Sequence, residues 1–182
     1  MSSKPICVSG LHFASASRSP TMNSRSRNAL SLLAFVAVTF AVAGIGGGAT
    51  TPAIRSGWYG SLRKPAWTPP DAVFGPVWAL LYTLMAVAAW RVWRKCGLSG
   101  AHAWWTFQLV LNLGWSLLFF GARRPCLALA ELVLLWLAIS ATIVSFRAAD
   151  RRASALLLPY LAWTSFALAL NVAIVRQNPK LG

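Results

Sequence analysis

Acidic side chains are nearly absent from this chain, whose 182 residues include only Asp71, Glu131 and Asp150. Histidine is also scarce, with two residues, and the three cysteines show no C-x-x-C spacing. Conventional hydrolytic and phosphoryl-transfer chemistry draws on paired carboxylates, histidine-assisted nucleophiles or metal clusters, and zinc or redox motifs draw on closely spaced cysteines. The sequence therefore predicts no catalytic residue and no metal site of these kinds, and it favours a protein that is not an enzyme.

Charged residues of both signs make up 11% of the chain, while hydrophobic residues make up 57%. A soluble domain contains about 25% charged residues, so this balance is typical of a membrane protein. The 17 lysines and arginines give a formal net charge of +14, which taken alone would suit nucleic-acid binding. These cations stand at the ends of the apolar segments, where side chains of this kind contact lipid phosphates. We therefore expect membrane lipid, and no nucleic acid, as a partner.

Five apolar stretches are long enough to cross a bilayer, which takes about 20 mainly apolar residues. They cover residues 28–49, 73–93, 101–121, 126–146 and 153–175. Their short connections leave no room for a soluble domain. The sequence therefore predicts an all-α integral membrane bundle of five transmembrane helices, formed by residues 28–179.

Residues 1–27 differ from the rest, since they are rich in Ser and Arg and lack acids. This composition is typical of a disordered tail or of an organelle presequence, and a third interpretation starts the protein at Met22. We favour a segment that is disordered or absent. We accordingly expect the bacterial cell envelope as the location. A mitochondrial or plastid membrane is the alternative if the tail is a targeting segment.

Aromatic and amide residues recur at helical spacing in three of the expected spans. An amide that faces hydrocarbon costs on the order of several kcal/mol, so the amides should point into the bundle. Such stripes indicate either a pocket for a flat, largely apolar ligand or helix packing held by amides. The stripes are Trp78, Tyr82, Met85 and Ala89; Gln108, Asn112, Trp115 and Phe119; and Tyr160, Trp163, Ala167 and Asn171.

The connection between the first two spans is crowded with aromatics, prolines and cations. Residues 58–70 read WYGSLRKPAWTPP, and residues 71–82 continue with DAVFGPVWALLY. Later landmarks are FQLVLNLGWS at residues 107–116 and PYLAWTSF at residues 159–166. Together these segments resemble the signature of the TspO/MBR family, the tryptophan-rich sensory and translocator proteins, over about residues 30–179.

The resemblance implies a five-helix bundle that senses or transports tetrapyrroles in a cavity capped by the first loop. Porphyrin or haem would be its ligand, and no cofactor would be required. An alternative implied by the same family is an enzyme that degrades porphyrin with light and oxygen through cavity tryptophans, although we favour the binding protein. By matching position, the cavity would include Tyr59, Trp78, Tyr82, Asn112, Trp115, Trp163 and Ala167, with Trp67 and Phe74 nearer the lid.

Other residues carry weaker signals. Glu131 is the acid placed within a span, where a carboxylate costs about 2.5–3.5 kcal/mol; it is expected to be uncharged, to pair with an inward polar group or to lie at a wet interface. His102 opens the third span, and a solvated position is favoured over haem ligation. Gly44 and Gly48 form a G-x-x-x-G motif, for which close packing within the bundle is favoured over a homodimer seam.

Overall fold

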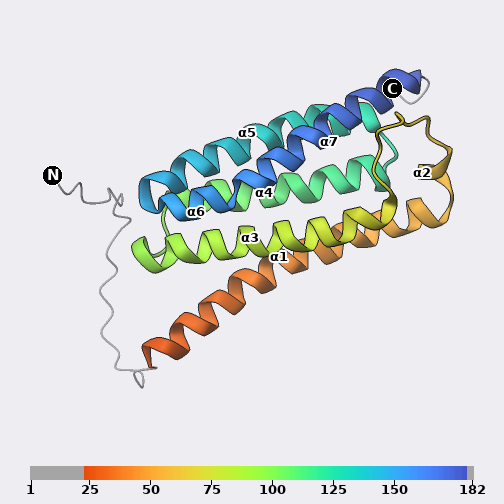
Figure 1. Cartoon of the computed structure of the whole chain (residues 1–182). Helices are drawn as coiled ribbons and strands as arrows, with labels where there is room; N and C mark the ends of the chain where they lie inside the picture. The colour runs from red at the N-terminus through yellow and green to blue at the C-terminus, as the bar shows by residue number, and fades with distance from the viewer. Residues whose placement is uncertain (1–22, 180–182) are drawn as a thin grey trace.

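The computed structural model describes residues 23–179, so the expectations for residues 1–22 lie outside the described part. Within that range the chain is helical, without a strand. The helices are α1 (Ser24–Arg55), α2 (Trp58–Ser61), α3 (Asp71–Cys96), α4 (Gly100–Ser116), the π-helix η1 (Leu117–Gly121), α5 (Pro125–Ala149), α6 (Arg151–Leu156) and α7 (Leu158–Gln177). Figure 1 shows the long helices lying side by side as one bundle.

The expected five spans are confirmed. Five helical segments of the described chain are long and apolar enough to cross a membrane, and they coincide with the predicted ranges. The first begins earlier than expected, because Asn23 caps α1 by accepting a hydrogen bond from the Arg25 amide at 3.2 Å. Residues 24–27 of the predicted tail therefore belong to the first helix.

Two of the spans are not regular α-helices throughout. The third changes into η1 for its last turn, where the Ala122 amide bonds the Leu117 carbonyl at 2.7 Å. The fifth is interrupted at Leu157, between α6 and α7. Pro159 lies in the first turn of α7, where its missing N–H is tolerated. A helix that continued through this point would need that N–H for a hydrogen bond to the carbonyl group four residues earlier.

The larger hydrophobic core occupies the end of the bundle where α3 finishes and α6 begins. Met85, Ala88 and Ala89 of α3 are fully buried there against Ile139 and Phe146 of α5. Lipid chains are as apolar as these side chains, so close packing rather than water exclusion drives helix association in a membrane. The alanines of α3 permit that approach because they carry little bulk.

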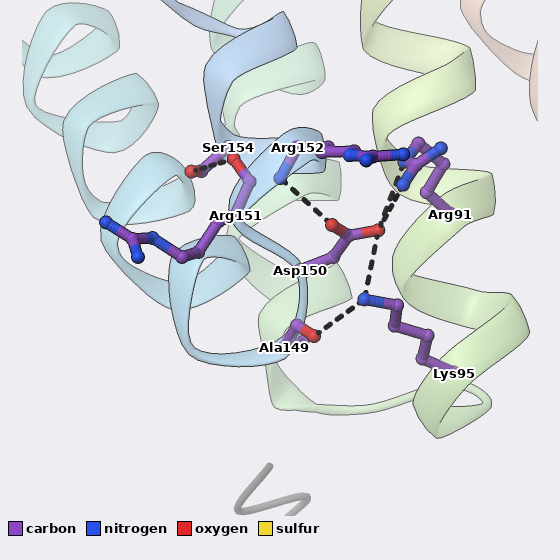
Figure 2. A network of polar contacts seen from close by, with 7 residues as sticks. All are labelled: Arg91, Lys95, Ala149, Asp150, Arg151, Arg152 and Ser154. Carbon is purple, nitrogen blue, oxygen red and sulfur yellow. Dashed lines mark hydrogen bonds and ion pairs between the residues drawn. The ribbon is translucent and has the colours of Figure 1, made fainter. Parts of the chain in front are cut away.

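An ion-pair cluster fastens the same end (Figure 2). The carboxylate of Asp150 caps α6 by accepting from the Arg152 amide at 2.9 Å, and it pairs with Arg91 at 2.9 Å and Lys95 at 3.4 Å. Burial alone would raise the pKa of Asp150, but the amide and the two cations outweigh it and hold that pKa below its usual value. The cluster thus ties α3 to the junction of α5 and α6.

Candidate functional site

A cavity of about 430 Å³ opens at the other end of the bundle, among α1, α3, η1 and α7, with Tyr59 of α2 in its wall. Its size lies within the range of small-molecule sites. Polar groups in the wall are few and include Thr50, Asp71, Ser116 and Asn171. Ten aromatic side chains line it: Phe40, Tyr59, Phe74, Trp78, Tyr82, Trp115, Phe119, Phe120, Trp163 and Phe166.

Small residues of α1 leave the space that these rings surround. Ala43, Gly46 and Gly47 line the cavity. Gly46 also allows α1 to approach α4, because a Cβ added there would lie 3.2 Å from the Ser116 Oγ. Gly44 and Gly48 have no atom within 4 Å of such a Cβ. The expected close packing of the G-x-x-x-G motif within the bundle is therefore wrong, because Gly46 lies at the close contact between α1 and α4 instead. The alternative of a homodimer seam stays a prediction.

The inner end of the cavity rests on a buried polar network that links three helices. Tyr82 of α3 lines the cavity and donates its hydroxyl hydrogen to Asn112 Oδ1 of α4. The Asn112 amide then donates to the Tyr160 hydroxyl of α7 at 3.0 Å. Asn112 is 2% exposed and Tyr160 1%. Asn112, predicted as a cavity residue, thus lies behind Tyr82 and orients its phenol instead of forming part of the wall.

The other predicted cavity residues lie in the wall itself. Tyr59, Trp78, Tyr82, Trp115, Trp163 and Ala167 all line the cavity. Trp163 contacts Phe74 edge-on at 5.7 Å, which joins α7 to α3 across the space between them. Trp78 is similarly edge-on to Tyr160 at 6.2 Å. Edge-to-face pairs of this kind are a favourable arrangement of aromatic rings, and here they pack wall residues of different helices against one another.

The first loop contributes Tyr59 to the cavity wall. Tyr59 is 6% exposed, and its ring lies 4.1 Å from the Lys64 ammonium. Burial, with a smaller contribution from Asp71, raises the pKa of Tyr59 to about 12, so the phenol stays neutral at physiological pH. Of the two predicted lid residues, Phe74 belongs to the wall, whereas Trp67 is 51% exposed and touches the wall residue Phe166 edge-on at 5.7 Å.

Two features of the wall were missed from the sequence. Phe120 joins the predicted Phe119 in the wall because η1 winds more widely than an α-helix. Asn171 was predicted to face inward, but its partners were not: oriented to satisfy both groups, its amide donates to the Pro125 carbonyl at 3.2 Å and accepts from the Leu129 amide at 3.3 Å. No pattern in the sequence marks that contact, which depends on how α7 packs against α5.

His102 and Glu131 lie elsewhere in the bundle. His102 is 6% exposed, its Nδ1 accepts from the Ser99 amide at 3.3 Å, and its Nε2 lies 3.2 Å from the Ala89 carbonyl. The favoured solvated position is therefore wrong, because the ring caps α4 from inside the bundle. The carboxyl oxygens of Glu131 are buried beside Gly114 without a hydrogen-bond partner among the described residues. Within the described residues the expected pairing with an inward polar group is therefore wrong, and the uncharged carboxyl group stays a prediction.

Across residues 23–179, no group of three or more His, Cys, Asp or Glu side chains could hold a metal ion. The wall instead offers ring faces and edges, with a few hydroxyl and amide groups. Such a surface can stack against a flat apolar molecule and hydrogen-bond to a small number of its polar atoms.

The fold and this cavity are those of a helical integral membrane protein with five spans, four of which surround an aromatic chamber. The chain belongs to the TspO/MBR family, whose family model matches residues 35–176. It is thus related to membrane proteins whose names include translocator protein and tryptophan-rich sensory protein.

Relatives from distant organisms share this similarity. The chain is 40% identical to the tryptophan-rich protein TspO of Chlorobaculum tepidum, over 85% of this chain and 99% of that protein. It is 40% identical to the tryptophan-rich sensory protein of Cereibacter sphaeroides, over 75% and 88% of the two chains. It is also 41% identical to the translocator protein of Homo sapiens, over 66% and 75%.

Proposed function

We propose that this protein binds a tetrapyrrole, either a porphyrin or haem, in the aromatic cavity and thereby senses or transports it. The observation that carries the proposal is the composition of the wall: three indoles, two phenols and five phenyl rings surround about 430 Å³. A tetrapyrrole is flat and largely apolar, with a few polar atoms, so it matches a wall that is mostly aromatic.

The wall also provides the polar groups that such a ligand needs. Ser116 and Thr50 offer hydroxyls, and the Tyr82 oxygen keeps a lone pair after donating its hydrogen to Asn112. Placing a few polar groups in an apolar pocket fixes the orientation of a ligand. Because the cavity lies between membrane-spanning helices, the bound molecule would be held within the bilayer.

The experiment is a titration of protoporphyrin IX into detergent-solubilised protein, followed by tryptophan fluorescence. We expect saturable quenching with a micromolar dissociation constant, about −8 kcal/mol. Trp78→Phe should remove part of the quenching, whereas Trp136→Phe is the matched control, because Trp136 bonds Ser165 outside the cavity wall. Linear quenching that does not saturate, equal to that of an unrelated helical membrane protein, would reject the proposal.

Porphyrin degradation is the second candidate, and the indole of Trp163 in the wall is the observation that favours it. Trp163→Phe keeps an aromatic ring but removes the easily oxidised indole. If the protein only binds porphyrin, we expect this change to weaken the binding free energy by about 1 kcal/mol and to have no other effect. Retained affinity with loss of a light-dependent product, in a wild type that forms one, would favour the enzyme over the binding protein.

We further propose the bacterial cell envelope as the location of this integral membrane protein, with an organelle membrane as the alternative. The similarity to a bacterial relative over 99% of its length supports the first. Expression of the full chain and of a chain that starts at Met22, followed by membrane fractionation, tests it. Equal insertion of both into a bacterial membrane supports the envelope, whereas organelle import that requires residues 1–21 supports the alternative.

A further inference from the structure

The first loop, residues 56–70, includes α2, and its segment from α2 to α3 passes close to the end of α7 (Figure 1). At that point the Asn178 side chain holds both backbone groups of Arg63. Asn178 Oδ1 accepts from the Arg63 amide at 3.1 Å, and its Nδ2 donates to the Arg63 carbonyl at 2.8 Å. The same Nδ2 donates to the Ile174 carbonyl at 2.8 Å, which seats the amide on the last turn of α7.

This clamp requires a primary amide. Its carbonyl oxygen meets a backbone donor while its nitrogen meets two backbone acceptors, a combination that the carboxylate of aspartate or a methyl group cannot reproduce. The clamp contacts the backbone of Arg63 and not its guanidinium, so it fixes the path of the loop whatever side chain stands at that position.

The residues next to Arg63 connect the clamp to the cavity. Leu62 is 6% exposed and belongs to the same buried cluster as Tyr59. The Lys64 ammonium lies over the Tyr59 ring, and Trp67 lies edge-on to Phe166. Tyr59 and Phe166 both line the cavity, one from α2 and the other from α7. The clamped segment therefore contacts two parts of the cavity wall, one on α2 and one on α7.

We propose that Asn178 is the positioning residue of the cavity mouth: it holds the first loop in place and so sets how fast a bound ligand leaves. This inference rests on the proposed function, in which the cavity binds a tetrapyrrole. Where a loop must open before release, its opening limits the rate of dissociation. Removal of the clamp should consequently raise the dissociation rate.

The test uses the full chain in detergent, with Asn178→Ala and Asn178→Asp as variants. Gln177→Ala is the matched control, because Gln177 is an exposed residue on the same last turn of α7. Hydrogen exchange of the amides of residues 62–68, measured without ligand, reports on the loop. Recovery of tryptophan fluorescence after dilution of the protoporphyrin IX complex reports on dissociation.

For Asn178→Ala we expect both exchange and dissociation to become about tenfold faster, which corresponds to about 1.4 kcal/mol. Asn178→Asp should behave similarly, because its carboxylate faces two carbonyls, and it keeps the test open if the alanine variant does not fold. Gln177→Ala should match the wild type in both measurements.

Two results would overturn the inference. Unchanged exchange in both Asn178 variants would show that the clamp does not hold the loop. Faster exchange with unchanged porphyrin dissociation would show that the loop does not control release. A wild type without saturable porphyrin binding would instead reject the proposed function, and the exchange measurement alone would then decide whether the clamp holds the loop.

Discussion

The two ends of the bundle are built from similar helices, but the interior is filled at one end and hollow at the other. Where α3 meets α6, Met85 and Phe146 fill the interior, and the Asp150 cluster fastens the helices (Figure 2). At the other end, aromatic rings surround a chamber of about 430 Å³. The contrast teaches that apolar content does not distinguish a core from a cavity in this protein. The spacing between the helices does.

Small residues act differently at the two ends because of what lies opposite them. Ala88 and Ala89 are fully buried, since neighbouring helices pack directly upon them. Gly47 and Ala167 face the chamber, where rings meet ring edges and leave the centre unfilled. The same loss of side-chain bulk therefore draws helices together at one end and enlarges the cavity at the other.

The largest expected effect concerns Asn112, which lies between the closed end and the chamber. Asn112→Leu should lower the stability of the protein by about 2 kcal/mol, because the buried hydroxyls of Tyr82 and Tyr160 each lose a hydrogen-bond partner. Ser116→Ala is the control from the cavity wall and should cost less than about 0.5 kcal/mol. Thermal unfolding in detergent measures both. An equal loss of stability in the two variants would contradict the difference drawn between the buried polar network and the cavity wall.

A smaller effect is expected at the closed end. Asp150→Asn keeps an N-cap side chain, since Asn caps about as well as Asp, but it removes the charge that pairs with Arg91 and Lys95. Both cations are partly exposed, so we expect a loss of about 1 kcal/mol in stability. Porphyrin affinity should not change, because the cluster is remote from the chamber. A parallel loss of affinity would show that the two ends are coupled.

The smallest expected effect is a loss of stability at acidic pH, which arises at the closed end. The pKa of Asp150 is lower in the folded protein than its usual value of about 3.9. Its contribution to stability is therefore complete above the unfolded pKa and is lost as pH falls below it. Between pH 5 and pH 3 the wild type should lose more stability than Asp150→Asn, by less than about 1 kcal/mol. Unfolding curves with the same pH dependence would reject this assignment.

Much of the fold was predictable because the thickness of a bilayer sets the length of each spanning helix. Each span requires about 20 apolar residues, and the positions of Arg and Pro mark where each ends. The inward orientation of Gln108, Asn112 and Asn171 was equally predictable, and each is no more than 2% exposed. An exposed amide would be too costly in hydrocarbon, so the burial of these residues follows from their chemistry.

The hydrogen-bond partners that join different helices could not be predicted from the sequence. Three sets of contacts join residues 30 to 115 positions apart: the pairing of Asn112 with two tyrosines, the contact of Asn171 with the first turn of α5, and the clamp of Asn178 on Arg63. The role of Gly46 in place of Gly44 and Gly48 likewise follows from how α1 meets α4, and the π turn at η1 was not predicted either.

Five membrane crossings, the inward faces of the helices and the family resemblance could all be read from the sequence, because hydrophobic length and helical period are properties of single segments. Where the interior is filled and where it is hollow depends on the packing of the helices. Whether an inward ring packs against a helix or borders a cavity depends on the separation of helices, and that separation is set by contacts between distant residues such as Gly46 with Ser116 and Tyr82 with Asn112.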